Sequence, residues 1–288
     1  MKRWIAVWLC IGVLFVAYGV SAKAQVEEVV SLGADLNQQQ QKQMLELFNV
    51  KADEVRIIRV TNQEERDYLE GLVSSDKIGT RAISSAYVSP LEEGEGLVVE
   101  THNINWVTKE MYANAMATAG IENARVIAAA PFPVSGTAAL TGIMKAFEEI
   151  TGEELDEEAK KVANEELVTT GDLGEDIGKD EAAALIKEIK ERIVRERIKD
   201  PEDIKRIILE IAKELNIQLT EEQINQIIEL MKKISQLDLD IDKITNQLEK
   251  ISKSLDNIRK TVEANKGILE RIWEAIRGFI NWLVGLFE

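Results

Sequence analysis

The C-terminal part of the sequence carries apolar residues at alternating steps of three and four positions. The stripe comprises Ile227, Leu230, Ile234, Leu237, Ile241, Ile244, Leu248, Ile251, Leu255, Ile258, Val262, Leu269, Ile272, Ile276, Phe279, Leu283 and Leu286. A period of 3.5 residues keeps these side chains on one side of a long helix, which then needs a surface to lie against. We expect one heptad helix over residues 220–288, about 100 Å long at 1.5 Å per residue, with Gly267 as the place for a bend.

The N-terminus has the pattern of a signal peptide for export. Two basic residues are followed by an apolar run over residues 4–20, and Ala22-Lys23-Ala24 supplies the small residues at which signal peptidase cleaves. We therefore expect residues 1–24 to be a signal peptide and Gln25 to begin the mature protein. Retention of the apolar run as a membrane anchor is the alternative, since roughly 20 such residues span a bilayer. Either outcome places the protein outside the cytoplasm, in the cell envelope or secreted.

The composition narrows the classes of partner. The chain has 35 Lys and Arg against 51 Asp and Glu, a net charge of −16. Removal of Lys2, Arg3 and Lys23 with the signal peptide leaves 32 against 51, or −19, which disfavours nucleic acid. Because Cys10 is the only cysteine and lies in the signal peptide, the mature chain has no disulfide. A disulfide-free exported protein of this size favours a Gram-positive envelope.

Residues 25–152 alternate strand-like and helix-like stretches, as in a small α/β domain. The expected strands are 29–33, 55–60, 81–87, 97–101 and 124–130, and the expected helices are 37–48, 63–73, 108–119 and 134–150. The strands 81–87 and 97–101 flank the acidic segment 92–96, which predicts a hairpin with an acidic loop. This alternation predicts helices packed on a mixed sheet of four or five strands.

After Gly152 the sequence becomes almost purely helical and highly charged. Asp200 followed by Pro201 predicts the start of a helix, and Thr220 with Gln223 predicts a capping box for the next one. We expect a helical region over residues 153–219 that leads into the heptad helix. The glycines between residues 171 and 178 lack the spacing of a phosphate loop and are accompanied by acidic residues, so we interpret this segment as a linker.

Five short sequence strings in the first part of the chain are, taken together, a specific signal of family membership. They are VSLGADL at 30–36, VTNQEER at 60–66, IGTRAISS at 78–85, MYANA at 111–115 and APFPVSGTAALTG at 130–142. With these strings the chain resembles a family of exported proteins from Gram-positive, spore-forming bacteria, known as domain of unknown function 1002. The resemblance covers roughly residues 30–167. It implies an envelope protein and provides no enzyme activity and no catalytic residues.

A candidate binding site lies where a helix follows an apolar strand, at Ser135, Gly136 and Thr137. Free backbone N–H groups and the positive end of the helix could hold a phosphate or a carboxylate there. The alternative is that these small residues only cap the helix and allow it to pack on the sheet. A hydrolase centred on Ser135 has little support, because the first glycine of the nucleophile elbow is absent and His102 is the only histidine in the chain.

No metal or cofactor is expected. Asp238, Asp240 and Asp242 have the spacing of a calcium-binding loop, but Lys243 stands where that loop requires glycine. The apolar period also continues through these residues, so an acidic helix face is the better interpretation. The sequence does not identify a small-molecule ligand.

Residues 268–287 widen the apolar stripe into a surface rich in aromatic residues. The candidate contact residues are Ile268, Leu269, Ile272, Trp273, Ile276, Phe279, Ile280, Trp282, Leu283, Leu286 and Phe287. Burial of one such side chain stabilises by about 1.5–3 kcal/mol, so this surface should not stay in water. It could be covered by the membrane surface, by another copy of the chain or by the chain's own α/β domain. Tryptophans suit the membrane interface, although the segment lacks a basic polar face.

Together these features predict an α/β domain followed by an all-α region that ends in a long coiled-coil helix. We expect a cell-envelope protein of structural or interaction type, and we favour this interpretation over an enzyme. Its C-terminal amphipathic helix would attach it to the membrane surface or to other copies. The alternative function is an anion-binding domain or a hydrolase centred on Ser135–Thr137.

Overall fold

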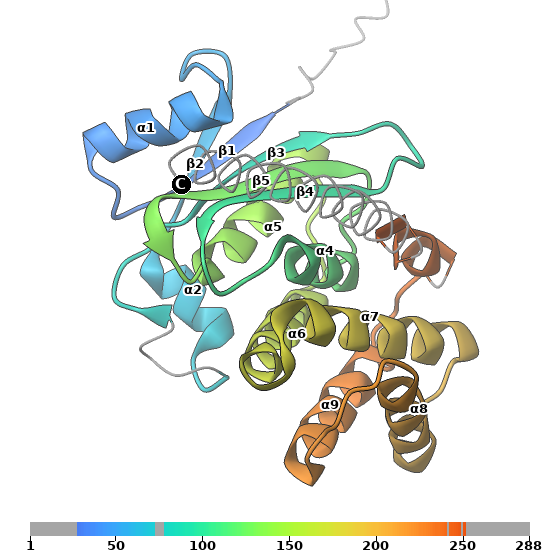
Figure 1. The fold of residues 1–288 in the computed structure, drawn as a ribbon. Coiled ribbons are helices and arrows are strands. Elements are labelled where there is room, and N and C mark those ends of the chain that lie inside the picture. The colour runs from blue at the N-terminus through green and yellow to red at the C-terminus, as the bar shows by residue number, and fades with distance from the viewer. Residues whose placement is uncertain (1–27, 73–77, 241, 249, 252–288) are drawn as a thin grey trace, which may run out of the picture.

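The computed structural model describes residues 28–72, 78–240, 242–248 and 250–251 (Figure 1). Its centre is a five-stranded sheet in the order β2-β1-β3-β5-β4. The strands are β1 (Val29–Gly33), β2 (Arg56–Val60), β3 (Ser85–Pro90), β4 (Leu97–Ile104) and β5 (Ala124–Val134). This confirms the mixed sheet that the alternating sequence pattern predicts.

Strand directions place most carboxyl ends at one edge of the sheet. β1 is parallel to β2 and antiparallel to β3, whereas β5 is antiparallel to β3 and parallel to β4. β3 therefore opposes the other four strands. The predicted hairpin between 81–87 and 97–101 is wrong, because β5 lies between β3 and β4. β5 can take this central position because its alanines, such as Ala128 and Ala129, are fully buried and small enough to be covered on both faces.

Helices cover both faces of the sheet (Figure 1). On one face α1 (Gln38–Phe48) packs on Val30, Leu32 and Tyr87, and the Tyr87 ring stacks on Phe48 with 6.2 Å between centroids. On the other face lie α2 (Asn62–Leu69), α4 (Lys109–Thr118) and α5 (Thr137–Thr151). The capping residue of α2 is Thr61, whose side chain accepts from the Glu64 N–H.

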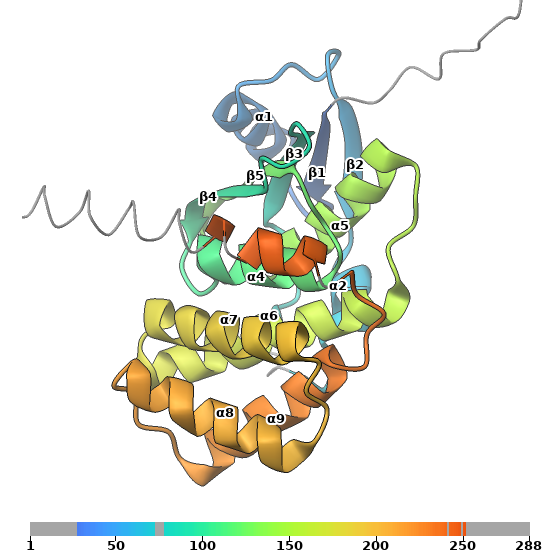
Figure 2. The same cartoon turned by 90° about the vertical axis from the view of Figure 1, so that its right-hand side faces the viewer.

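Four further helices extend the fold away from the sheet (Figure 2). They are α6 (Glu157–Ile177), α7 (Lys179–Glu196), α8 (Pro201–Glu214) and α9 (Glu221–Ile234). The predicted helix starts are confirmed, since Asp200 caps α8 with Pro201 in its first turn and Thr220 forms a capping box with Gln223. One apolar core runs from the sheet through α4, α6 and α7 to α9, so the helical region is built on the α/β region in the described part of the chain.

A buried ion pair joins α4, α6 and α7. Lys190 and Glu166 are both fully buried, and the Lys190 Nζ lies 2.6 Å from the Glu166 Oε1. The same Nζ donates to the Asn114 carbonyl oxygen at 2.8 Å and to the Thr118 Oγ1 at 3.0 Å, and the Thr118 hydroxyl donates to the second Glu166 oxygen. Burial lowers the pKa of Lys190, an effect that Glu166 opposes.

The predicted linker at residues 171–178 is wrong, because these residues form the end of α6 and its junction with α7. Gly171 lies inside α6 against the Trp106 ring, where an added Cβ would come 2.3 Å from the Trp106 Cζ2. Gly178 has a φ of +98° and separates the two helices. These glycines therefore serve close packing and a sharp change of direction.

The predicted continuous heptad helix is also wrong within the described residues. α9 ends at Ile234 with Ser235 as its C-cap, and the chain is helical again only from residue 242. The Asp240 Oδ1 accepts from the Lys243 N–H at 3.0 Å, which starts the second segment as an N-cap does. The apolar stripe continues across the break because Leu237 and Leu239 also pack against the core.

The described part of the stripe packs on its own chain. Six stripe residues are buried in the main core: Ile227, Leu230, Ile234, Ile244, Leu248 and Ile251. The last segment is held against the sheet side of the molecule, since Lys243 pairs with Glu122 at 2.6 Å and the Lys250 Nζ donates to the Gly94 carbonyl oxygen. Residues 1–27 and 252–288, with the predicted signal peptide and contact surface, lie outside the described residues. No helix among the described residues is both long and apolar enough to cross a membrane.

Candidate functional site

A pocket of about 470 Å³ opens at the carboxyl ends of β4 and β5, and we call it the strand-end pocket. In open α/β sheets this edge is where ligands usually bind. Its lining residues come from α2, from the segment before β3, from the ends of β4 and β5, from the start of α5 and from α6. They are Glu65, Ile78, Gly79, Thr80, Arg81, Ile83, Ser84, Asn105, Trp106, Phe132, Val134, Ser135, Gly136, Thr137, Ala138 and Glu175. The three residues singled out in the sequence, 135–137, thus line one pocket together.

Glu65 is the buried acid of this pocket, with 1% of its surface exposed. Its Oε1 accepts from the Thr137 hydroxyl at 2.5 Å, and its Oε2 accepts from the Asn62 amide at 3.2 Å. Burial raises the pKa of Glu65 to about 7, even though these hydrogen bonds and the charge of Arg66 act to lower it. Near neutral pH this carboxyl group therefore exists in both protonation states and can donate as well as accept.

The start of α5 depends on a glycine. Gly136 is the N-cap residue with a φ of +99°, and no side chain caps the helix. An added Cβ would lie 2.5 Å from the Tyr112 Oη and 2.5 Å from the Ile104 Cγ2. The Tyr112 hydroxyl donates to the Gly136 carbonyl oxygen at 2.5 Å, and the Ser135 and Thr137 hydroxyl oxygens lie 3.2 Å apart. The buried tyrosine thus holds the turn that carries both hydroxyl groups.

The protein's own carboxyl group lies at this helix start. Glu65 accepts from the hydroxyl of Thr137, the first residue of α5, and so brings a carboxyl group close to the place where an external anion would bind. A second carboxylate, Glu175, is also in the pocket wall and accepts from the Trp106 Nε1–H at 3.0 Å. This arrangement favours uncharged ligands over phosphate or a free carboxylate.

The wall formed by the segment before β3 is fastened by two hydrogen bonds. The Arg66 guanidinium donates to the Gly79 carbonyl oxygen at 2.6 Å, and the Asp35 Oδ2 accepts from the Ala82 N–H at 2.8 Å. Ser84 in this wall is 4% exposed. At the opening, Phe132 is 37% exposed and adds an aromatic surface.

The structure does not bring the only histidine of the chain to Ser135. His102 is exposed on β4, opposite Ala129 of β5, and does not line the strand-end pocket. Among the described residues, no group of three or more His, Cys, Asp or Glu side chains is placed to hold a metal ion.

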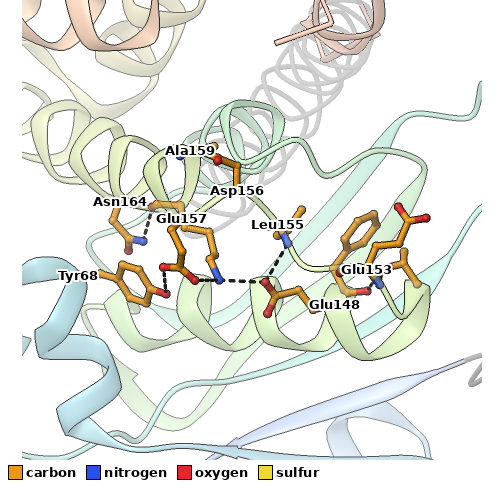
Figure 3. A network of polar contacts seen from close by, with 11 residues as sticks. Tyr68, Glu148, Glu153, Leu155, Asp156, Glu157, Ala159 and Asn164 are labelled. Carbon is orange, nitrogen blue, oxygen red and sulfur yellow. Dashed lines mark hydrogen bonds and ion pairs between the residues drawn. The ribbon is translucent and has the colours of Figure 1, made fainter. Parts of the chain in front are cut away.

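A second polar cluster joins α2, α5 and α6 and is shown in Figure 3. The Lys160 Nζ lies 2.6 Å from Glu157 and 2.9 Å from Glu148, and the Tyr68 hydroxyl donates to Glu157 at 3.3 Å. Burial acts to lower the pKa of Lys160, but the two carboxylates outweigh it and raise this pKa above its usual value. Glu148 also accepts from the Leu155 N–H at 3.0 Å. Because these charges satisfy one another, the cluster acts as a link between helices.

Sequence reasoning missed Glu65, Trp106 and Glu175 as site residues. A signal for Glu65 exists, because it precedes the buried Leu69 by four positions and so occupies the inner face of α2. No comparable signal marks Trp106 and Glu175, which are 69 positions apart in the sequence.

Comparisons with known proteins define the family. The profile described as "Protein of unknown function (DUF1002)" matches residues 32–251, and so extends past the resemblance over 30–167 to include α6–α9. The uncharacterized protein YpuA of Bacillus subtilis (strain 168) is 45% identical over 242 residues, 83% of each chain. No solved structure matches. The chain therefore belongs to the DUF1002 family of proteins of unknown function.

Proposed function

We propose that the protein is an exported cell-envelope protein whose folded body is held at the membrane surface by residues 268–287. The N-terminal sequence pattern supports export. The observation that carries the proposal is the burial of the first part of the stripe. Ile227 to Ile251 of the stripe are used by the body itself wherever they are described, and we infer that the apolar surface at 268–287, which lies outside the described residues, is the part that meets a partner.

The composition of this segment favours a lipid surface over a second copy. A seam shared between copies requires a long free stripe, and its first part is covered by the chain's own core. Trp273 and Trp282 are suited to the interfacial zone of a membrane. The basic residues Lys266, Arg271 and Arg277 are matched by Glu270, Glu274 and Glu288. Attachment would therefore depend on apolar burial and respond weakly to salt.

Vesicle flotation tests this proposal. The chain from Gln25 should float with phosphatidylcholine vesicles in both low and high salt, and deletion of Gly267–Glu288 should abolish flotation. The double substitution Trp273→Glu and Trp282→Glu should weaken binding, whereas Glu274→Gln, which changes the polar side of the same segment, should leave it unchanged. Equal flotation of full-length and deleted chains would refute the anchoring role.

Sedimentation of the same two proteins without vesicles separates the competing role. If the full-length chain forms oligomers that the deletion abolishes, and neither protein floats with vesicles, then residues 268–287 serve self-association and the membrane proposal is wrong. A monomer that floats supports the membrane surface as the partner.

A further inference from the structure

We propose that the strand-end pocket binds an uncharged, hydroxyl-rich small molecule of the saccharide class. The proposal rests on the described body alone and is independent of how that body is attached to a surface. The volume of the strand-end pocket, about 470 Å³, falls within the range of roughly 300–1,000 Å³ that is usual for small-molecule sites.

The polar groups of the pocket match a ligand that carries hydroxyl groups. The hydroxyls of Ser84, Ser135 and Thr137 and the carboxyl of Glu65 come from three separate parts of the sequence and line the same space. A hydroxyl both donates and accepts, and so does each of these groups when Glu65 is protonated. The Thr137 hydroxyl and the Glu65 carboxyl already bond each other, so a ligand hydroxyl would use the donor and acceptor capacity that remains to them.

One of these groups, the Ser84 hydroxyl, lacks a hydrogen-bond partner among the described residues. Ser84 is 4% exposed and lines the pocket, and its side-chain hydroxyl makes no hydrogen bond to any described residue. Its oxygen is not among the buried side-chain atoms that lack a partner in the described residues, so it is in contact with solvent. Its position in the pocket wall indicates that a ligand or solvent hydroxyl completes it.

The apolar part of the wall includes two aromatic residues, Trp106 and Phe132. Trp106 is fixed by its hydrogen bond to Glu175 and by contact with Gly171 of α6. Phe132 at the opening exposes a large apolar surface. Rigid aromatic side chains offer broad contact at little entropic cost, which suits the C–H faces of a sugar ring.

The charges of the pocket oppose the other two ligand classes. Glu65 and Glu175 disfavour an anion, while Arg81, exposed at the same pocket, offsets part of their attraction for a cation. The site is also preformed, because Tyr112, Arg66 and Asp35 each hold a lining segment by a hydrogen bond of 2.5–2.8 Å.

The test is an NMR titration of the indole N–H signals in the chain from Gln25, with the Trp106 signal identified by its loss in Trp106→Phe. We expect glucose, N-acetylglucosamine or maltose to move the Trp106 signal and to leave those of Trp273 and Trp282 in place. Inorganic phosphate and tetramethylammonium chloride should move none of them. If none of the three sugars moves the Trp106 signal, or if either ion moves it, the proposal is wrong.

Ser84→Ala distinguishes binding from a structural role. Since this hydroxyl makes no bond within the described protein, its removal should leave the melting temperature unchanged. Sugar affinity should fall about five- to tenfold, the effect of one lost hydrogen bond. Thr101→Ala removes a hydroxyl from β4 outside the pocket lining and should change neither quantity. Unchanged affinity in Ser84→Ala, or a loss of affinity that merely follows a lower melting temperature, would overturn the assignment.

Discussion

Substitution of Glu65 by glutamine should change how the stability of the protein depends on pH. Burial raises the pKa of Glu65 from 4.5 to about 7 in the folded protein. The folded state therefore holds this proton more tightly than the unfolded state. The resulting stabilisation is fully present below about pH 4.5, falls as the pH rises from 4.5 to 7, and is absent above pH 7.

The size of this effect follows from the shift. A change from 4.5 to about 7 corresponds to about 3 kcal/mol of unfolding free energy, at roughly 1.4 kcal/mol for each pKa unit. Glutamine has nearly the same shape and keeps an oxygen that can accept from the Thr137 hydroxyl, but it does not titrate. The wild-type protein should therefore lose about 3 kcal/mol relative to Glu65→Gln between acid and mildly alkaline pH.

Urea denaturation followed by tryptophan fluorescence, at several pH values from about 4.5 to 8, measures this difference. The difference between the unfolding free energies of wild type and Glu65→Gln at each pH removes the contribution of all other titrating groups. The matched control is Glu64→Gln, one position away. Burial acts to raise the pKa of Glu64, but its bonds to Lys145 and Thr61 outweigh this and lower it.

For Glu64 the pH dependence has the opposite sign, because stabilisation by a lowered pKa is present at neutral pH and lost as the pH falls. The difference between wild type and Glu64→Gln should therefore shrink towards acid pH. If the curves of wild type and Glu65→Gln run parallel across the whole range, the Glu65 carboxyl titrates normally and the reasoning about its burial is refuted.

Two substitutions test the packing of the helical layer. Lys190→Met should lower the unfolding free energy by about 3–5 kcal/mol in urea denaturation, because it leaves the buried Glu166 carboxylate without its charged partner. The double variant Lys190→Met with Glu166→Gln should lose less unfolding free energy than Lys190→Met alone. Losses that simply add would contradict this. Gly171→Ala should destabilise the protein by about 1–3 kcal/mol and shift the Trp106 fluorescence, because the added Cβ would meet the indole ring. Alanine favours helices more than glycine does, so a stabilised variant would disprove this contact.

Local signals in the sequence predicted much of the fold. β1 lies at 29–33 as expected, and the caps at Asp200 and Thr220 mark the true starts of α8 and α9. Such features depend on residues a few positions apart, so a single sequence contains them. The order of the strands in the sheet does not depend on neighbouring residues alone. β5 pairs with both β3 and β4, and only tertiary packing decides that it separates two strands that are neighbours in the sequence.

The apolar stripe misled for a related reason. Apolar spacing of three and four positions requires burial on one side of a chain, but it does not say what covers that side. Here the described part bends back after Ile234, and Leu237 and Leu239 keep the spacing through the break because they pack on the same core. A stripe on one continuous helix and a stripe on two segments of one body look the same in sequence.

For the site, the sequence located one wall of the pocket and missed the others. Ser135, Gly136 and Thr137 stand out because a strand, a glycine and a helix follow one another within a few residues. Glu65 and Trp106 come from other elements, and only the folded chain brings them to the same space. The buried glutamate is also the reason why we propose an uncharged ligand in place of the anion that the helix start alone would predict.

The strand-end pocket depends on the helical region as well as on the sheet. Glu175 in its wall belongs to α6, and the indole of Trp106 takes its position because Gly171 of α6 leaves room for it. α6 is in turn tied to α4 and α7 through Glu166 and Lys190. The similarity to the family extends through the same helices, to residue 251. The unit that forms the pocket is thus the whole body, and an α/β domain that ended at residue 152 would lack one of its walls.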